Sequence, residues 1–341
     1  MKIPLADLKK SFDTYFSALI DRILEPYPEE YHYLKSYILE GGKQVRPLLF
    51  LEACSIWGGT INEQTLHIAS GIELIHNFFL IHDDIMDNDE MRRDKLTLHA
   101  YFAKGRSETA GRALALVLGD LLYTEALKCI SQGASDKTLR IIQEKTLEIC
   151  SNTANGQILE FTSAKTPTTA ETLSFYKKKT AEYSIYFPLI IAAYYTDAEH
   201  SHKISLDYLL DFSDNLGIAY QLYDDMSEII GTKKRMADSD RCGDIMRAKM
   251  TPILIDVLPH LSEELKARVE KAYVLQTILS EDDEKEIIAK IHEVGILKDI
   301  QVDINDFLLI AGVKMGLLGL DDSEVIQKLI DTYSHDATTS S

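Results

Sequence analysis

Two clusters of acidic residues lie inside apolar, helix-forming stretches of this chain, and they limit how it can fold. The first cluster reads His82-Asp83-Asp84-Ile85-Met86-Asp87, and the second reads Tyr223-Asp224-Asp225-Met226-Ser227-Glu228. Carboxylates are almost never fully buried without a partner, because removing their charge from water is costly. The fold must therefore give both clusters a partner, and divalent cations are the obvious one.

The rest of the chain has a helical period. Apolar residues recur at spacings of three and four nearly everywhere, as in Ile68, Ile72, Ile75 and Phe79. This period is typical of amphipathic or buried helices, and the alternation typical of strands is scarce. Thr168-Thr169-Ala170-Glu171 predicts a capping box at the start of one helix. We therefore expect an all-α fold.

Composition favours a single large domain. The chain has 341 residues, of which 45% are hydrophobic, and no Pro/Gly/Ser-rich linker divides it. We expect one helical domain over residues 1–333 and a disordered polar tail over residues 334–341. The N-terminus has no apolar signal core, and no apolar run approaches the length of a membrane span.

Charge and cysteine content narrow the class of protein. The net charge of −18 argues against a nucleic-acid surface, and it means that a polyanionic ligand needs local cations or metals. The four cysteines are far apart and form no CxxC pair. We expect reduced thiols, mostly core residues, in a cytoplasmic protein.

The spacing of the acids suits a metal site. Residues four apart share a helix face, so Asp83 and Asp87 point the same way, one turn apart. Asp224 and Glu228 repeat this spacing in the second cluster. If the two helices face each other, their carboxylates line one cavity. Magnesium prefers carboxylate oxygens and completes its shell with water and substrate phosphates, so we expect a metal–diphosphate cluster between the two helices.

Two other interpretations of the acids are open. A single DDxxD sequence can be a solvated helix face or a cap, although two such motifs near basic residues favour a shared site. His82-Asp83 could also be the metal pair of an all-helical phosphohydrolase. That chemistry needs further histidines, and only His76 is close.

Basic residues lie near both clusters, as binding of an anion requires. The segment Gly41-Gly42-Lys43-Gln44-Val45-Arg46-Pro47 reads as a helix end, a bend and a new helix start. This places Lys43 and Arg46 beside free N–H groups, which suits an anionic ligand. The other candidate cations are Arg92, Arg93, Lys179 and Lys249. Each of them could instead be an ordinary surface charge, and His76 could be a core histidine.

Taken in order, these motifs resemble those of the trans-isoprenyl diphosphate synthases, the polyprenyl synthetase family. The matching stretches, which cover roughly residues 40–252, are GGKQVRP, LIHDDIMDNDEMRR, KTA at 179–181, GIAYQLYDDMSE and DIMRAKMTP. The resemblance implies the isoprenoid synthase fold, an all-α bundle around a deep central cavity, usually as a homodimer. It also implies three magnesium ions that bridge an allylic diphosphate to both acidic motifs.

By position, the resemblance assigns roles to individual residues. The metal ligands would be Asp83, Asp84, Asp87 and Asp224, with Asp225 and Glu228 acting through water. The diphosphate of isopentenyl diphosphate would be bound by Lys43, Arg46, His76 and Arg93. The allylic diphosphate would be bound by Arg92, Lys179 and Lys249. The catalytic residues would be Lys179, Thr180 and Gln221, the last two offering oxygens near the developing allylic cation.

The chain departs from the family pattern in several places. Gln44 stands where the family often has Arg, Asp94 stands where Gly follows the Arg pair, and Glu228 ends the second motif in place of Asp. The family's loop lysine would fall near Ser239 or Asp240, in the charged segment 231–243, where Lys234 or Arg241 could substitute. We expect these changes to affect substrate affinity and lid closure more than the reaction.

The implied reaction breaks a carbon–oxygen bond with diphosphate as the leaving group. Metals and basic residues stabilise the charge that develops on the diphosphate. The double bond of isopentenyl diphosphate attacks the allylic cation, and a proton is then lost to the released diphosphate. A dry cavity protects the cation from water, and no side-chain nucleophile is needed.

Two aromatic residues are expected to set the product length. A helical turn rises about 5.4 Å, so residues one turn before Asp83 would form the floor of the channel for the growing tail. Phe78 and Phe79 stand there, and such a pair resembles the farnesyl type. We expect farnesyl diphosphate (C15), or geranylgeranyl diphosphate (C20) if only one ring enters the channel. Both rings could also pack outward as ordinary core.

Two other functions share some of these features. A class I terpene cyclase has the same fold and first motif, but its second motif follows (N/D)DxxSxxxE, which the second cluster does not fit. It also has no use for a GGKxxRP site. A non-catalytic partner subunit would keep the helices and lose the acids, which are present here. The sequence therefore favours a short-chain isoprenyl diphosphate synthase.

Overall fold

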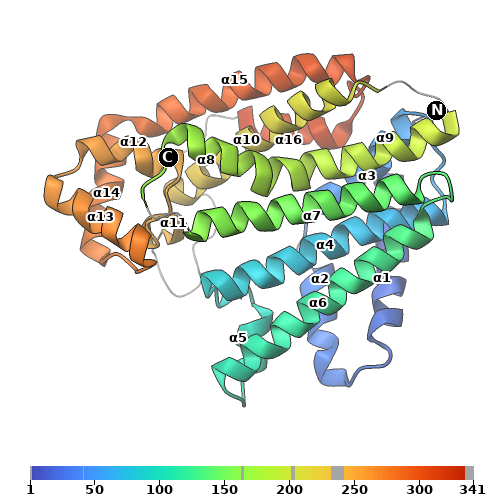
Figure 1. Ribbon diagram of the computed structural model, residues 1–341, viewed down its shortest axis with the longest axis horizontal. Helices are drawn as coiled ribbons and strands as arrows, with labels where there is room; N and C mark the ends of the chain where they lie inside the picture. The colour runs from blue at the N-terminus through green and yellow to red at the C-terminus, as the bar shows by residue number, and fades with distance from the viewer. Residues whose placement is uncertain (1, 41, 163–164, 201–203, 232–241, 335–341) are drawn as a thin grey trace. The chain divides into compact units, whose positions relative to one another are not determined.

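The structure, a computed structural model, describes residues 2–40, 42–162, 165–200, 204–231 and 242–334 (Figure 1). Contacts between residues divide the chain into two compact units. Unit 1 comprises Met1–Thr146, Pro188–Ile204 and Asp322–Val325, and unit 2 comprises Leu147–Phe187, Ser205–Asp321 and Ile326–Ser341. The single domain over residues 1–333 therefore stays a prediction, and residues 335–341 of the predicted tail lie outside the described residues.

Helices form nearly all of the regular structure, so the predicted all-α fold is confirmed. Unit 1 contains α1 (Leu5–Leu24), η1 (Glu29–His32), α2 (Tyr33–Leu39), α3 (Val45–Ile56), α4 (Glu63–Asp87), α5 (Leu98–Ala103), α6 (Glu108–Gly133), the first part of α7 (Leu139–Thr162) and most of α9 (Phe187–His200). Unit 2 contains the rest of α7, α8 (Thr169–Tyr176), η2 (Lys177–Tyr186), α10 (Leu206–Ile230), α11 (Gly243–Met246), α12 (Pro252–Val257), η3 (Leu258–His260), α13 (Glu263–Leu275), α14 (Glu281–Val294), α15 (Ile296–Leu317) and most of α16 (Glu324–Ser334).

The long helix α4 carries the first acidic cluster in its last turn. Asn62 begins this helix with a capping box, in which its side chain accepts from the backbone of Thr65 and Thr65 accepts in return. The helix then packs along α6 and against α3 (Figure 1). It ends at Asp87, and the next residue, Asn88, adopts a left-handed conformation with φ 55°.

A tight hairpin follows α4. Its strands β1 (Met91–Arg92) and β2 (Lys95–Leu96) are antiparallel and are the only strands in the described part of the chain. The two turn residues, Arg93 and Asp94, have φ values of 54° and 61°. A type I′ turn needs positive φ at both positions, and Asp tolerates this conformation better than most residues. Asp94 therefore fits the turn at which the family has Gly.

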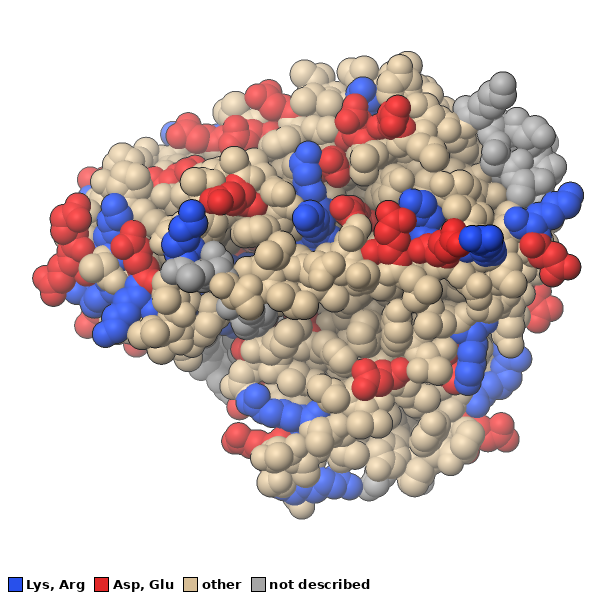
Figure 2. Space-filling view, viewed as in Figure 1, with Lys and Arg blue, Asp and Glu red and all other residues tan. Residues whose placement is uncertain are grey.

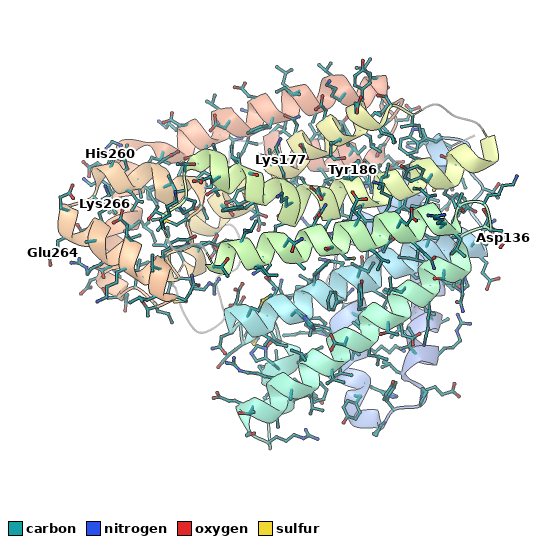
Figure 3. The ribbon with its side chains drawn as sticks, in the orientation of Figure 1. Asp136, Lys177, Tyr186, His260, Glu264 and Lys266 are labelled. Carbon is teal, nitrogen blue, oxygen red and sulfur yellow. The ribbon has the colours of Figure 1, made fainter. Side chains whose placement is uncertain are left out.

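Unit 2 is built around α10, which carries the second acidic cluster. This helix packs along α15 and along η2. A Cβ on Gly217 would lie 2.3 Å from Cβ of Ala181, so only glycine allows this close approach of α10 to η2. The segment η2 is a π-helix, whose ends, Lys177 and Tyr186, are labelled in Figure 3. Such segments are rare and occur frequently at functional sites.

Two further predictions can be compared with the structure. The capping box from Thr168 to Glu171 is present at the start of α8, as predicted. The four cysteines, Cys54, Cys129, Cys150 and Cys242, are free and buried, which confirms their role as core thiols. Among the described residues, the helices are too short or too polar for one of them to cross a bilayer.

Glu73 places a carboxyl group in the core of unit 1. It lies within α4 and is 3% exposed, and its Oε2 has no hydrogen-bond partner among the described residues. Burial raises the pKa of Glu73 from 4.5 to about 7, although Arg46 and Arg93 favour the ionised form. Between pH 4.5 and about pH 7, the folded protein therefore keeps a proton on Glu73 that the unfolded chain has released.

This proton makes stability depend on pH in a stated direction. A group with a raised folded pKa stabilises the protein at low pH, and this contribution is lost as pH rises through the folded value. Acidification from pH 8 to pH 5.5 should raise the free energy of unfolding by about 2 kcal/mol through Glu73. We expect Glu73→Gln to remove this part of the pH dependence.

Urea unfolding of both proteins at the two pH values measures the difference. The control is Glu63→Gln, which changes an exposed carboxylate in the first turn of the same helix and should keep the wild-type pH dependence. Parallel pH dependence in Glu73→Gln and the wild type would contradict the assignment.

Candidate active site

The first acidic cluster presents two of its three acids to solvent. Asp83 and Asp87 are half-exposed at the end of α4, and the side chain of Asp83 is 33% exposed. Asp84, between them, is 1% exposed. Asp83 and Asp87 therefore remain accessible to a ligand, as the spacing predicts, whereas Asp84 points into unit 1.

Asp84 is held by two donors. The hydroxyl group of Tyr37, in α2, donates to its Oδ2 at 2.6 Å, and Nε of Arg92 donates to its Oδ1 at 2.5 Å. Nη2 of Arg92 also lies 3.8 Å from Oδ2 of Asp83. Burial raises the pKa of Asp84 to about 6, against the opposing effect of Arg92. Asp84 thus anchors the arginine that was predicted to bind the allylic diphosphate.

The residues predicted to bind isopentenyl diphosphate lie around the start of α3. Nη1 of Arg46 lies 3.3 Å from Nε2 of His76. Burial lowers the pKa of His76 well below 6.5, with Arg46 adding to the effect, so the ring is neutral at pH 7 and its Nε2 accepts from the guanidinium group. A Cβ on Gly42 would lie 3.2 Å from Nη1 of Arg93, so Arg93 lies over the loop that carries Lys43.

Gln44, where the family often has Arg, has a cation beside it. Its Oε1 accepts from Nζ of Lys9 at 2.7 Å, and Lys9 also pairs with Asp13 in the same helix. No sequence motif marks Lys9, which lies in α1, 35 residues before Gln44. The expected deficit of one cation near this position is therefore partly offset.

Phe78 and Phe79 belong to an aromatic cluster between α4 and α6. The ring of Phe78 lies 5.0 Å from Phe79, 4.5 Å from His82 and 5.0 Å from Tyr123 of α6, measured between centroids. Both phenylalanines are half-buried. Sequence reasoning missed Tyr123, because no motif marks it.

The second acidic cluster repeats the arrangement of the first. Asp224 and Glu228 are half-exposed on α10, whereas Asp225 is 2% exposed. Asp225 accepts from the hydroxyl group of Tyr176, in α8, and from Nε2 of Gln221 at 2.9 Å. Burial raises the pKa of Asp225. The second acid of each motif is therefore buried beside a tyrosine.

Gln221 in turn contacts Thr180. Oγ1 of Thr180, in the π-helix η2, donates to Oε1 of Gln221 at 2.9 Å. Because Asp225 accepts from the amide nitrogen of Gln221, the orientation of this amide is defined at both ends. The two residues predicted to lie near the allylic cation are thus in contact within unit 2.

Both predicted lysines of unit 2 are paired with acids that sequence reasoning missed. Nζ of Lys179 lies 2.7 Å from Oε2 of Glu160, and Nζ of Lys249 lies 3.2 Å from Oδ1 of Asp244. Burial alone would raise the pKa of Glu160. The positive charges of Lys179 and Lys249 outweigh this effect, and the pKa of Glu160 is lowered. The two lysines therefore lie close enough to act on one carboxylate, and their partners keep them oriented without substrate.

Glu228 has a structural contact besides its predicted role. Its Oε1 accepts from the backbone N–H of Asp244 at 2.9 Å, at the start of α11. The longer side chain, where the family has Asp, reaches this helix start. The basic loop candidates Lys234 and Arg241, with Ser239 and Asp240, lie outside the described residues, as does Gly41.

The accessible acids suit magnesium. The described residues contain no group of three or more His, Cys, Asp or Glu side chains that could hold a metal ion. Magnesium usually takes one or two carboxylates and keeps water and phosphate oxygens. Asp83 and Asp87 in unit 1 and Asp224 in unit 2 offer oxygen ligands of this kind. Their convergence on one ligand stays a prediction, because they lie in different units.

Comparisons with known proteins agree with the motifs. The family model described as polyprenyl synthetase matches residues 28–291. A short chain isoprenyl diphosphate synthase of Methanocaldococcus jannaschii is 32% identical over 266 residues, 76% of this chain and 76% of that protein. A farnesyl diphosphate synthase of Bacillus subtilis is 30% identical over 242 residues, 68% of this chain and 77% of that protein.

Solved structures share the fold. The crystal structure of a geranylgeranyl pyrophosphate synthase from Corynebacterium glutamicum, complexed with isoprenyl diphosphate and magnesium, covers 97% of this chain and 98% of its own, with a TM-score of 0.78 and 23% identity. At this identity the likeness concerns the fold alone, whereas the family model and the sequence relatives carry the assignment. The chain belongs to the polyprenyl synthetase family and is a trans-prenyl diphosphate synthase, an all-α transferase.

Proposed function

We propose that this enzyme transfers an allylic prenyl group from its diphosphate to isopentenyl diphosphate, and so makes a short all-trans prenyl diphosphate. One observation carries the proposal. Each acidic motif has two accessible acids, and each unit holds the cations that a diphosphate needs. Arg46 and Arg93 supply them in unit 1, and Lys179 and Lys249 supply them in unit 2.

The metal is magnesium, and we propose three ions. The family depends on magnesium in general, and the accessible carboxylates of Asp83, Asp87 and Asp224 are suitable ligands. When bound, the ions neutralise the charge that develops on the leaving diphosphate. Glu228 and Asp225 are the candidates for contacts through water.

The basic residues form two sets, each proposed to bind the diphosphate of one substrate. Lys43, Arg46, His76 and Arg93 are proposed to bind isopentenyl diphosphate. Arg92, Lys179 and Lys249 are proposed to bind the allylic diphosphate. Lys179 and Lys249 would exchange their present carboxylate partners, Glu160 and Asp244, for phosphate oxygens. Basic groups aimed at the leaving group lower the barrier, because they are already in place when its charge develops.

The oxygens of Thr180 and Gln221 are proposed to act on the allylic carbon atoms, where the positive charge develops. Their contact at 2.9 Å places a hydroxyl and an amide oxygen together, and we propose that they stabilise the allylic cation. The double bond of isopentenyl diphosphate attacks this cation, and the proton lost afterwards passes to the released diphosphate. Lys179, Thr180 and Gln221 are the proposed catalytic residues.

The product is proposed to be farnesyl diphosphate, with geranylgeranyl diphosphate as the alternative. The cluster of Phe78, Phe79, His82 and Tyr123 supports a short channel, since four rings leave little room for a long tail. Relatives carry both names, and geranylgeranyl synthases are the more numerous among them. Product length therefore needs a direct measurement.

We also propose a homodimer in the cytoplasm that binds no nucleic acid. Leu116 and Val117 of α6 are exposed apolar residues that a second copy can cover. The four free cysteines support a reducing compartment. Figure 2 shows acidic and basic side chains interspersed over one face, and with a net charge of −18 this pattern does not favour nucleic acid.

Incubation of the protein with isopentenyl diphosphate, magnesium and each of dimethylallyl, geranyl and farnesyl diphosphate tests the proposal. We expect condensation of both substrates and a C15 product from the two shorter primers. Release of diphosphate from an allylic substrate alone, with a cyclic product, would indicate a terpene cyclase. No turnover of any combination would indicate a non-catalytic subunit. Either result would contradict the proposal.

Replacement of both phenylalanines tests the channel floor. We expect Phe78→Ala/Phe79→Ala to lengthen the main product by at least one isoprene unit, because the blocking rings are gone. Chromatography of the dephosphorylated products measures chain length. The control is Phe187→Leu, a buried core residue of α9, which should leave the product unchanged. A double variant that makes only the wild-type product would refute the floor assignment.

A further inference from the structure

The second acid of each motif is arranged in the same way, although the two motifs lie on different helices and in different units. Asp84 and Asp225 are the most buried acids of their clusters. Each accepts one hydrogen bond from a tyrosine hydroxyl group and one from a side chain of the proposed machinery. In both motifs, the first and fifth residues are the accessible acids.

In unit 1, the chain of contacts runs from Tyr37 through Asp84 to Arg92. Tyr37 is 8% exposed in α2, and its hydroxyl group reaches Oδ2 of Asp84 at 2.6 Å. The other oxygen, Oδ1, accepts from Nε of Arg92. The Nε contact fixes the plane of the guanidinium group. Its terminal nitrogen Nη2 lies 3.8 Å from Oδ2 of Asp83, so the guanidinium group is held beside the first acid, where we expect it to meet an anion.

In unit 2, the chain of contacts runs from Tyr176 through Asp225 to Gln221. Tyr176 is buried at the end of α8 and donates to Oδ2 of Asp225. The other oxygen, Oδ1, accepts from Nε2 of Gln221 at 2.9 Å. A carboxylate that accepts from the amide nitrogen directs the amide oxygen of Gln221 toward Thr180.

We propose that Tyr37 and Tyr176 are positioning residues, which hold Asp84 and Asp225 so that these acids orient Arg92 and Gln221 rather than bind metal directly. This inference rests on the proposed function. It assigns different roles to the acids of each motif. The accessible first and fifth acids face the metal, and the second acid faces inward. It revises the expectation that Asp84 is a direct metal ligand.

A tyrosine suits this role for physical reasons. Its ring is rigid and packs in an apolar environment, and its hydroxyl group gives one donor at a fixed place. A buried carboxylate that loses one donor keeps an unsatisfied oxygen, so it tends to move toward the remaining donor or toward solvent. Loss of the hydroxyl group should therefore disturb the partner residue without removing any group that touches substrate.

Steady-state kinetics of three Tyr→Phe variants in the full-length enzyme tests the proposal. Tyr37→Phe should lower kcat/KM for the allylic substrate by about five- to tenfold, with the KM for isopentenyl diphosphate and the half-saturating Mg²⁺ concentration within about twofold of wild type. Tyr176→Phe should lower kcat by about five- to tenfold, because Gln221 acts on the reacting carbon, and should also leave Mg²⁺ saturation unchanged.

The matched control is Tyr33→Phe. Tyr33 lies one turn before Tyr37 in α2, and its hydroxyl group donates to the backbone oxygen of Leu96 at 2.8 Å rather than to a motif acid. It should lower the melting temperature as much as Tyr37→Phe does and leave all kinetic constants unchanged. Equal kinetic losses in Tyr33→Phe and Tyr37→Phe would show that destabilisation alone is responsible, and would overturn the proposal.

Two acid variants distinguish a role in orienting Arg92 from a role in binding metal. They also test the proposal if a Tyr variant does not fold. Asp83→Asn should raise the half-saturating Mg²⁺ concentration more than about tenfold. Asp84→Asn should lower kcat/KM for the allylic substrate and leave Mg²⁺ saturation unchanged. A large Mg²⁺ shift in Asp84→Asn would overturn the proposal. Failure of the proposed function is a separate result, in which the wild-type enzyme forms no prenyl product.

Discussion

The cost of placing carboxylates on apolar helices governs the arrangement of this protein. An acid at such a position must stay in contact with water, bind a cation or accept hydrogen bonds. Both motifs combine these solutions, since the first and fifth acids keep access to solvent and the second acid is buried between two donors. The donors come from α2 and the β1–β2 hairpin in unit 1, and from α8 and α10 in unit 2. Each motif thus fixes neighbouring elements as well as offering ligands.

The same principle explains the other charged contacts of the two units. Lys179 and Lys249 are each held by a carboxylate, and Lys9 is held by Gln44 and Asp13. Such partners limit the motion of long, flexible side chains, so a lysine that binds substrate as proposed would lose less entropy on binding. Glu73 is the exception, since burial keeps its carboxyl group neutral over part of the physiological pH range.

The sequence predicted the helical fold and the capping box at Thr168 because these features are encoded by neighbouring residues. It predicted that the first and fifth acids of each motif share a helix face, because residues four apart lie about one helical turn from each other. It could not predict Tyr37, Tyr176, Glu160 or Lys9, since each reaches its partner from a distant segment and no periodicity marks it. The sequence shows no boundary between the two units for a related reason. Each is assembled from three separate segments, so no linker separates them in the sequence.

We propose that accessible acids from both motifs bind one metal–diphosphate cluster while the second acids stay hydrogen-bonded to their tyrosines. A crystal structure with Mn²⁺ and an unreactive allylic diphosphate analogue, with the ions located by anomalous scattering, tests this most directly. We expect ions bound by Asp83 and Asp87 on one side of the diphosphate and by Asp224 on the other, with Asp84 and Asp225 still hydrogen-bonded to Tyr37 and Tyr176. Ions in separate pockets, or ions ligated directly by Asp84 or Asp225, would contradict it.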